Sequence, residues 1–570
     1  MSHSQANKSG EDTSSSSGTE EPPVETSPLL LGSMEENFKK LKRAVLARRP
    51  VLREILRKHG RKKLYKYVQD YVSVNLNPPI KRRQDEFITA FKNEVAKRLG
   101  HEISESAALQ LAKHYFVSTA DHHGPICHPF FVNSNLLTAA PYFELQDPDL
   151  KYVIVLSCSD VSLNNSSFPR GLIFHSSSND QLKMHRLGFF PASMQPVYNF
   201  PPYSKKEILK VKSNLEEKVK SGEVKPEEGA AINKIIDTIY KDPEVLACKN
   251  YSYQITKTNF ELWKKFFAPN HVAPPDLIYL EMEGLVGRLL IDHHFYQDTI
   301  LNHMIFDPVY EPMIIKNFEG IFGSFSRQEQ SGTYLFWALP EGSKARVQLW
   351  RKGDFLVSKD ESYKIELKPD IIRQALERKE LIPGLLLSYT TICFYYGLKC
   401  LRGFNQVNYL TLMKNGYIKM NTDLGNYRSI EVCARAQTKE LCDGLTIAFL
   451  QDSNGKMTLA TGLDLILYGT SQTWTQFVDI AKNITFGEAL SPLMPEIYKI
   501  SYLEEEWDPA LVAIKDEDII KLMKLDTKIP ACAHIKTNGA GSIVCPIIIR
   551  LVPFIFTVFH LEKLRVFIIM

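Results

Sequence analysis

The chain has 570 residues, of which 44% are apolar and 24% are charged, as in an ordinary globular protein. These values exclude a wholly disordered, collagen-like or coiled-coil chain, and the length suits about two to four domains. Lys and Arg number 69 against 65 Asp and Glu, so the net charge of +4 does not by itself indicate a nucleic-acid binder. The nine Cys residues include no C-x-x-C pair, which argues against a disulfide scaffold or a structural zinc site. We therefore expect a reducing, cytoplasmic location.

The two ends of the chain differ from the rest in composition. Residues 1–34 are mostly Ser, Glu, Pro and Gly, and such a segment buries too little apolar surface to order itself, so we predict disorder there. Residues 541–570 form a strongly apolar tail, which Arg550 and Pro553 interrupt. A membrane-spanning helix needs about 20 apolar residues, so we expect a buried segment. Membrane association of this tail, or a tail foreign to the fold, remains an alternative.

Residues 35–114 are predicted to form a basic helical region. Residues 38–67 contain 13 Lys and Arg and one acid, and their apolar residues recur at helical spacing. A helix is expected to begin at Pro50 and to end near Gly60, and another to span residues 81–99. The charged side of these helices is either a solvated face or a polyanion contact, through residues 38–67, with RNA or an anionic membrane.

Residues 115–424 are predicted to form an α/β core with a Rossmann-like sheet. The continuous apolar run at residues 152–156 is typical of a parallel strand buried on both faces. Further strands are expected at residues 171–175 and 274–280. Residues 205–245 are predicted to form a helical arm, an αα-hairpin or short coiled coil, whose role is either structural or the joining of two copies of the chain in a homodimer.

The C-terminal region, residues 425–540, is predicted to mix helices with short strands. The strands are expected at residues 430–433 and 446–450, with a hairpin turn at residues 452–456.

Two Asp-His-His sequences are the densest groups of potential metal ligands. Asp121, His122 and His123 are followed closely by His128, and a turn at residues 124–125 is suited to aim them together. Imidazole and carboxylate groups together suit Zn or Mn, and they also suit general acid–base catalysis. We therefore predict that Asp121, His122 and His123 are catalytic and that they hold a divalent metal with His128.

The second Asp-His-His sequence follows an apolar run that we interpret as a strand. It consists of Asp292, His293 and His294, which we predict as further metal ligands. The sequence leaves open whether the two groups meet.

The end of the strand before Asp160 is a third candidate. Residues 157–160 read Ser-Cys-Ser-Asp, and ligand sites of open α/β sheets lie at the carboxyl ends of strands. Asp160 is therefore predicted to be catalytic and to orient the substrate.

The chain resembles two known families. The Asp-His-His sequences resemble those of the DHH phosphoesterases, which hold Mn, although no D-x-D sequence precedes Asp121. Over residues 115–420 the order of segments resembles the cysteine ligases of bacillithiol biosynthesis. Residues 118–125, with His-His in place of Gln-Gln, look like the first family motif, and residues 153–160 stand where the family has a strand ending in Glu-Asp-His-Asp.

The later segments of the ligase resemblance carry further residues. A strand pair contains Arg346, and residues 403–409 look like the family's Gly-Gly-Pro-x-Glu-x-x-Tyr element, with Gln406 at the acidic position and Tyr409 at its end. The resemblance implies a Rossmann-like fold with a helical arm. We predict that Gln406, Tyr409 and Arg346, together with His128 of the first Asp-His-His group, bind the substrate.

These observations favour an enzyme that acts on a small polar metabolite, with ligase-like amide formation between cysteine, or a related amine, and a carboxylate. No P-loop, G-x-S-x-G or H-E-x-x-H sequence is present, which argues against a P-loop ATPase, an α/β-hydrolase and a zincin. The alternatives are a non-catalytic protein that binds RNA or membranes through its basic helices, and a metal-dependent phosphoesterase that uses the Asp-His-His sequences.

Overall fold

A computed structural model describes residues 28–72, 80–142, 147–178, 181–267 and 273–535 of the chain. The described residues belong to one compact unit, which ends at Ile535. The apolar tail at residues 541–570 and residues 1–27 of the segment predicted to be disordered lie outside the described residues. Within that segment residues 28–34 are helical, because helix α1 begins at Pro28.

The fold is mixed α/β and has a four-stranded parallel sheet near its middle. The strand order is β14-β1-β2-β5, and all three pairings are parallel. The strands are β1 (Phe116–Ser118), β2 (Tyr152–Ser157), β5 (Asp276–Glu281) and β14 (Lys399–Leu401). All six residues of β2 are buried, which confirms the prediction of a strand covered on both faces.

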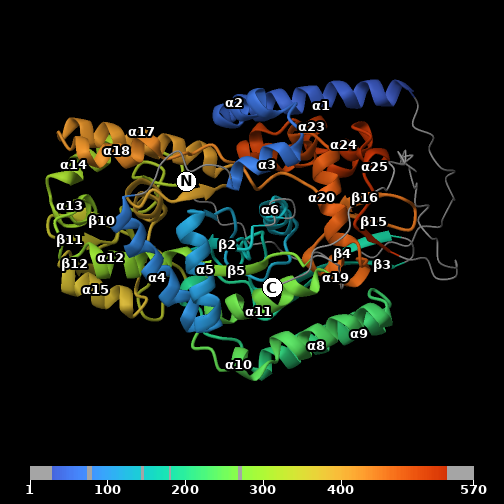
Figure 1. The fold of residues 1–570 in the computed structure, drawn as a ribbon, viewed down its shortest axis with the longest axis horizontal. Coiled ribbons are helices and arrows are strands. Elements are labelled where there is room, and N and C mark those ends of the chain that lie inside the picture. The colour runs from blue at the N-terminus through green and yellow to red at the C-terminus, as the bar shows by residue number, and fades with distance from the viewer. Residues whose placement is uncertain (1–27, 73–79, 143–146, 179–180, 268–272, 536–570) are drawn as a thin grey trace, which may run out of the picture. The chain divides into compact units, whose positions relative to one another are not determined.

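Two helical layers cover this sheet because successive side chains of a strand point to opposite faces. Ile154 and Leu156 of β2 belong to one core, whereas Val153 and Val155 belong to another. The first core is shared with α4 (Lys81–Leu99), α5 (His101–Lys113) and α12 (Met282–His293), and the second with α6 (Pro129–Ala139) and α11 (Tyr251–Lys265). Figure 1 shows β2 and β5 with α5 and α11 close by.

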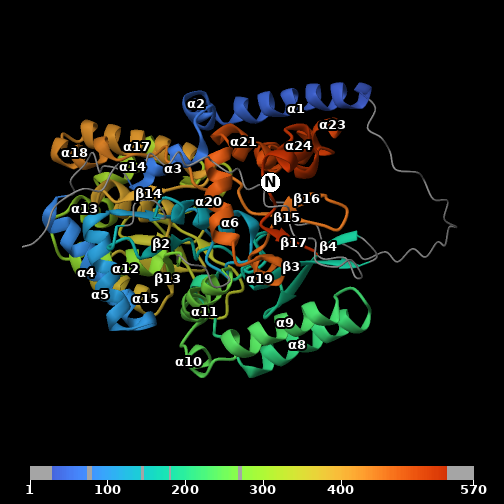
Figure 2. The ribbon, with the colours of Figure 1, turned by 45° about the vertical axis from the view of Figure 1, so that its right-hand side comes forward.

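The N-terminal helices pack on the C-terminal region rather than standing apart. They are α1 (Pro28–Arg48), α2 (Pro50–His59) and α3 (Leu64–Val72), and α1 and α2 lie above the C-terminal helices in Figures 1 and 2. Leu41, Val45 and Leu52 are fully buried, while Arg53 and Arg57 are exposed. The apolar stripe predicted from the sequence is thus the packing face, and the polyanion contact stays a prediction for the exposed basic face.

The helical arm forms where it was predicted. It consists of α8 (Lys205–Lys220) and α9 (Pro226–Ile235), followed by a π-helical turn at Ile236–Tyr240 and by α10 (Pro243–Leu246). The arm packs on an antiparallel hairpin of β3 (Gly171–Ser178) and β4 (Gln181–Gly188), which does not join the parallel sheet. A homodimer through the arm stays a prediction.

The remaining elements complete the core and the C-terminal region. From residue 300 to 424 the helices are α13 (Ile300–Phe306), α14 (Tyr310–Phe318), α15 (Pro369–Glu377), α16 (Leu385–Tyr389) and α17 (Gln406–Asp423). In the same stretch the principal strands are β8 (Phe336–Ala338), β9 (Val347–Gln348), β10 (Trp350–Lys352), β11 (Phe355–Val357), β12 (Lys364–Glu366) and β13 (Leu381–Pro383).

The C-terminal region combines one small sheet with helices. Its elements are α18 (Tyr427–Arg435), β15 (Phe449–Gln451), β16 (Met457–Leu459), α19 (Gly462–Tyr468), α20 (Thr473–Asn483), α21 (Phe486–Leu490), α22 (Met494–Ser501), α23 (Pro509–Val512), α24 (Asp516–Leu522), α25 (Leu525–Lys528) and β17 (Ala533–His534). Residues 430–433, predicted as a strand, lie in α18, because four residues are too few for their period to distinguish a strand from a helix. Of the described residues, no helix is long and apolar enough to cross a membrane.

Candidate functional site

A cavity of about 660 Å³ lies at the carboxyl ends of β1 and β14. The chain passes from β1 to β2 and β5 on one side, and it returns to β14 on the other side of β1. Such a reversal of strand order is where open α/β sheets bind their ligands. The polar residues that line it include His122, His128, Ser167, Asn405, Gln406 and Asp443.

His122 lies in the turn after β1 and lines the cavity. Its Nδ1 is 3.1 Å from the Asn165 Oδ1, which also accepts hydrogen bonds from the backbone N–H and the hydroxyl of Ser167. Nδ1 of His122 therefore donates, and its Nε2 carries the lone pair. Burial lowers the pKa of His122, so the neutral ring is a base at neutral pH.

His128 is the N-cap of α6 and contributes a donor to the same cavity. Its Nδ1 accepts a hydrogen bond of 3.3 Å from the backbone N–H of Phe130, which satisfies one free donor of the helix N-terminus. The neutral ring therefore carries its proton on Nε2. Burial lowers the pKa of His128 to about 3, which keeps it neutral. Both His122 and His128 contact the ring of Phe131, so a base and a donor are neighbours.

Asp443 is a cavity residue that the sequence patterns did not indicate. Its Oδ1 accepts a hydrogen bond of 2.8 Å from the backbone N–H of Gly444, and its Oδ2 lies toward Gly403. Burial, with the nearby charge of Asp121, raises the pKa of Asp443 to about 7. The carboxyl group can therefore both donate and accept a proton near neutral pH.

Gln406 and Tyr409 of α17 also line the cavity, and substrate binding by them stays a prediction. The Gln406 amide donates a 2.7 Å hydrogen bond to the Thr119 carbonyl and accepts one of 3.1 Å from the Gly403 backbone N–H. Gln406 thus joins the ends of β1 and β14 and fixes the wall of the cavity. The ring of Tyr409 packs against the ring of Phe322, which also lines the cavity.

Asp121 and His123 lie behind the cavity wall, where each is fully engaged. The Asp121 carboxylate accepts hydrogen bonds from Ser134 (3.0 Å) and Asn135 (2.7 Å) of α6, and burial raises its pKa to about 7. His123 has Nδ1 2.6 Å from the Ser157 hydroxyl and Nε2 3.0 Å from the Ser252 hydroxyl. These two predicted catalytic residues tie β1 to α6, β2 and α11, and neither is a lining residue of the cavity.

The second Asp-His-His sequence ends α12, not a strand, and its side chains diverge. Asp292 is exposed and forms an ion pair with Arg288 one turn earlier. His294 is buried, with Nδ1 3.0 Å from the Thr299 hydroxyl and Nε2 3.0 Å from the Tyr396 hydroxyl. His293, the residue between these two in the sequence, is half-buried.

The described residues do not bring together three predicted metal ligands from either Asp-His-His sequence. The physical reason is local. The turn after β1 sends His122 and His123 to opposite sides, and residues 292–294 on a helix point about 100° apart from one to the next.

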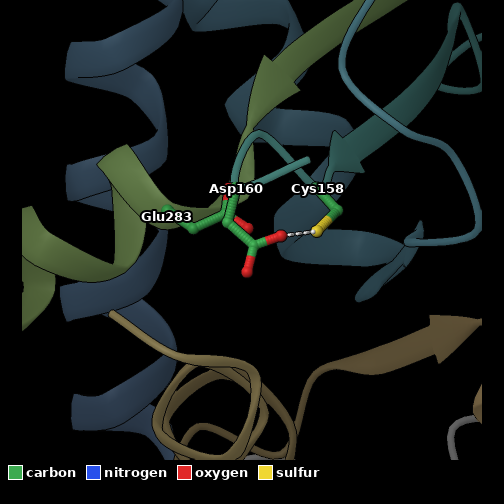
Figure 3. A group of neighbouring side chains, drawn as sticks. All are labelled: Cys158, Asp160 and Glu283. Carbon is green, nitrogen blue, oxygen red and sulfur yellow. Dashed lines mark hydrogen bonds between the residues drawn. The ribbon is translucent and has the colours of Figure 1, made fainter. Parts of the chain in front are cut away.

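Asp160 lies in a separate buried group at the carboxyl ends of β2 and β5. It accepts a 3.0 Å hydrogen bond from the Cys158 thiol and forms a 2.8 Å ion pair with Arg346. Ser159 donates to Glu283 from its backbone N–H (2.8 Å) and its hydroxyl (2.6 Å). Figure 3 shows Cys158 and Asp160 next to Glu283 of α12. Burial and Asp160 raise the pKa of Glu283 to about 7.

The sequence patterns used to select Asp160 also point to Glu283, which was not among the predicted residues. Glu283 lies just beyond the end of β5, as Asp160 lies just beyond the end of β2, so the strand-end rule that selected Asp160 applies equally to Glu283. Asp443 had no such signal, because it reaches the cavity from the loop after α18.

Comparison with known proteins assigns the chain to no family, because no protein-family model matches it and no curated protein matches it significantly.

Proposed function

We propose that the protein is an enzyme that acts on a small polar metabolite in the cavity at the carboxyl ends of β1 and β14, with His122 as its general base. The observation that carries this proposal is the hydrogen bonding of His122 to Asn165, which leaves its Nε2 lone pair available in a residue that lines the cavity. A cavity of about 660 Å³ suits a small molecule, because ligand pockets range over about 300–1,000 Å³.

The polar groups of the cavity suit a reaction in which a nucleophile loses a proton. Nε2 of His122 accepts the proton of an amine or thiol, and Nε2–H of His128 donates a hydrogen bond to the oxygen that becomes negative. The carboxyl group of Asp443, with its pKa near 7, returns a proton to a leaving group. We propose amide-bond formation as the reaction, on the order of segments that resembles the cysteine ligases, with the parallel sheet as a Rossmann-like core. The step balances with a carboxylate that ATP has activated as an acyl phosphate or acyl adenylate. The amine nitrogen bonds to the acyl carbon, the phosphate or AMP leaves, and the amine proton passes to His122.

The experiment is a mass-spectrometric screen of the full chain with a mixture of amino acids, amino sugars and small carboxylates, with and without ATP. We expect one amine and one carboxylate to be consumed and an amide product to appear. His122→Asn is the matched variant, because its amide N–H keeps the hydrogen bond to Asn165 while the basic Nε2 is lost. Loss of a general base lowers the rate by about 10²–10⁴-fold.

Two results would contradict the proposal. One is that no compound is consumed and none raises the melting temperature of the folded chain. The other is a product that His122→Asn forms at the wild-type rate.

A further inference from the structure

We propose that Cys158, Asp160 and Glu283 form a binding site for a thiophilic divalent cation of the zinc type. One ligand atom from each of the three residues lies within 4.8 Å of the others. All three side chains are buried, and they come from the ends of two adjacent strands, β2 and β5 (Figure 3). Only Asp160 belongs to the residues selected from the sequence, and there as a catalytic group.

The two carboxylates are each half satisfied by the protein. Glu283 accepts both hydrogen bonds of Ser159 on Oε2, while its Oε1 is buried and has no hydrogen-bond partner among the described residues. Asp160 pairs with Arg346 through Oδ2, which leaves Oδ1 to the Cys158 thiol. A buried carboxylate oxygen without a partner is costly, and a cation would satisfy it.

Ser159 and Arg346 bind the carboxylate oxygens that would face away from the cation, Glu283 Oε2 and Asp160 Oδ2. Metal-binding carboxylates are usually fixed by hydrogen bonds to the oxygen that does not bind the metal. Ser159 fixes Glu283 in this way, and Arg346 fixes Asp160. Arg346 is itself held, because its guanidinium lies 4.3 Å from the centre of the Trp337 ring.

The charges of the group match a divalent cation. With a thiolate and two carboxylates the group carries three negative charges, of which Arg346 offsets one. A divalent cation offsets the other two, so the buried group becomes neutral. The neighbouring cations Arg98 and Lys379 are paired with Glu281 and do not take this role.

The thiolate decides the class of metal. A sulfur ligand favours zinc over magnesium or calcium, which prefer oxygen ligands. Tetrahedral bonds of about 2.0–2.3 Å place ligand atoms about 3.3–3.8 Å apart, which lies within the 4.8 Å limit of this group. Three protein ligands leave one position open, as in catalytic zinc sites. The backbones of Cys158 and His122 are paired, so the cation would lie beside the cavity wall.

The test measures metal binding by the full chain and no turnover, so its result is independent of the proposed reaction. The chain is purified without chelators, its zinc content is measured by mass spectrometry, and it is then titrated with Co²⁺ after zinc removal. We expect about one metal ion per chain and a thiolate-to-cobalt charge-transfer band in the near ultraviolet. Zinc is also expected to raise the melting temperature.

Two nearly isosteric variants test the ligands. Cys158→Ser keeps a hydroxyl beside Asp160, and Glu283→Gln keeps an acceptor for Ser159, and both are expected to bind zinc at least about tenfold more weakly. Cys433→Ser, which changes a buried thiol of α18, is the matched control and should bind as the wild type does. If circular dichroism shows that Cys158→Ser is unfolded, the test of the metal site rests on the wild-type cobalt band and on the zinc affinity of Glu283→Gln.

The proposal is overturned if the folded wild-type chain takes up neither zinc nor cobalt. It is also overturned if cobalt binds without a thiolate band, or if Glu283→Gln, or a folded Cys158→Ser, binds zinc as tightly as the wild type.

Discussion

Asp464 holds His175 through two hydrogen bonds: its Oδ1 accepts from the backbone N–H and its Oδ2 from the imidazole Nδ1, each at 2.7 Å. His175 lies on β3, and Asp464 lies in the first turn of α19. The pair therefore joins the β3–β4 hairpin, on which the arm packs, to the C-terminal region. Both side chains are buried. Burial alone would lower the pKa of His175, but the Asp464 carboxylate outweighs burial and raises that pKa above its ordinary value.

This pair predicts that part of the stability depends on pH. Because the pKa of His175 is higher in the folded chain, its stabilisation is complete below the unfolded pKa of about 6.5 and is lost as the pH rises through the folded pKa. His175→Asn keeps an N–H donor but does not titrate, so it should lose about 1.5–3 kcal/mol near pH 5.5 and less near pH 9. Urea unfolding at both pH values measures this. His101→Asn, at an exposed site, is the control, and a pH-independent loss in His175→Asn would refute the prediction.

Arg98 is a buried cation whose removal should destabilise the fold. It is 3% exposed, bonds to Glu94 at 2.6 Å and lies 3.3 Å from Glu281 at the end of β5. Arg98→Met leaves two buried carboxylates short of a partner, which costs about 3–5 kcal/mol. Arg82→Met breaks an ion pair between the exposed Arg82 and the half-buried Glu86 of the same helix, and it should cost at most about 1 kcal/mol because the guanidinium is in solvent. Chemical denaturation compares the two, and equal losses would show that Arg98 is not a structural cation.

His128 combines a structural role with a role in the cavity, and two substitutions separate them. His128→Ala removes the N-cap of α6 and should lower the unfolding free energy by about 1 kcal/mol, whereas His128→Ser supplies a new cap and should restore it. Neither variant has the Nε2–H donor, so both should lose ligand-induced stabilisation. Thermal unfolding with and without the metabolite found in the screen measures both effects. Ligand-induced stabilisation in His128→Ser equal to that of the wild type would remove His128 from the binding site.

Gly462 lies at a close contact between the C-terminal region and the core. A Cβ at this position would lie 2.4 Å from the Ile126 carbonyl oxygen and 2.5 Å from the Phe266 ring. Gly462→Ala should therefore lower the unfolding free energy by about 1–3 kcal/mol, because the backbone oxygen has little room to move. Gly425→Ala differs, since its Cβ meets nothing within 4 Å and its cost comes from a positive φ of 72°. Crowding is tested by Gly462→Ser, which should cost at least as much as Gly462→Ala.

The packing of α1 predicts a large loss on truncating its core residues. Leu41 and Val45 are fully buried in a cluster that includes the C-terminal helices. Leu41→Ala should cost about 2–5 kcal/mol, because the cavity left behind has rigid walls. Lys40→Ala on the exposed side should change stability by less than about 0.5 kcal/mol. A similar small effect for both would mean that α1 is not part of the folded core in solution.

The sequence by itself determined the elements whose signals are local. Helix α4 spans residues 81–99, the range predicted from the sequence. The turn between the two helices of the arm lies at Gly222, whose φ of 76° suits glycine. β2 was recognisable because the uninterrupted apolar run from Tyr152 to Leu156 is typical of a strand covered on both faces. These features depend on periodicity and turn chemistry, which neighbouring residues carry.

Tertiary structure decided what the candidate site contains. His122 lines the cavity while His123 lies behind its wall, because the turn after β1 separates two adjacent side chains that the sequence treats alike. Glu283 joins Cys158 and Asp160 only because β2 and β5 are neighbours in register, with Ser157 opposite Glu281. Such pairings depend on packing between segments more than 100 residues apart, and no local pattern encodes them.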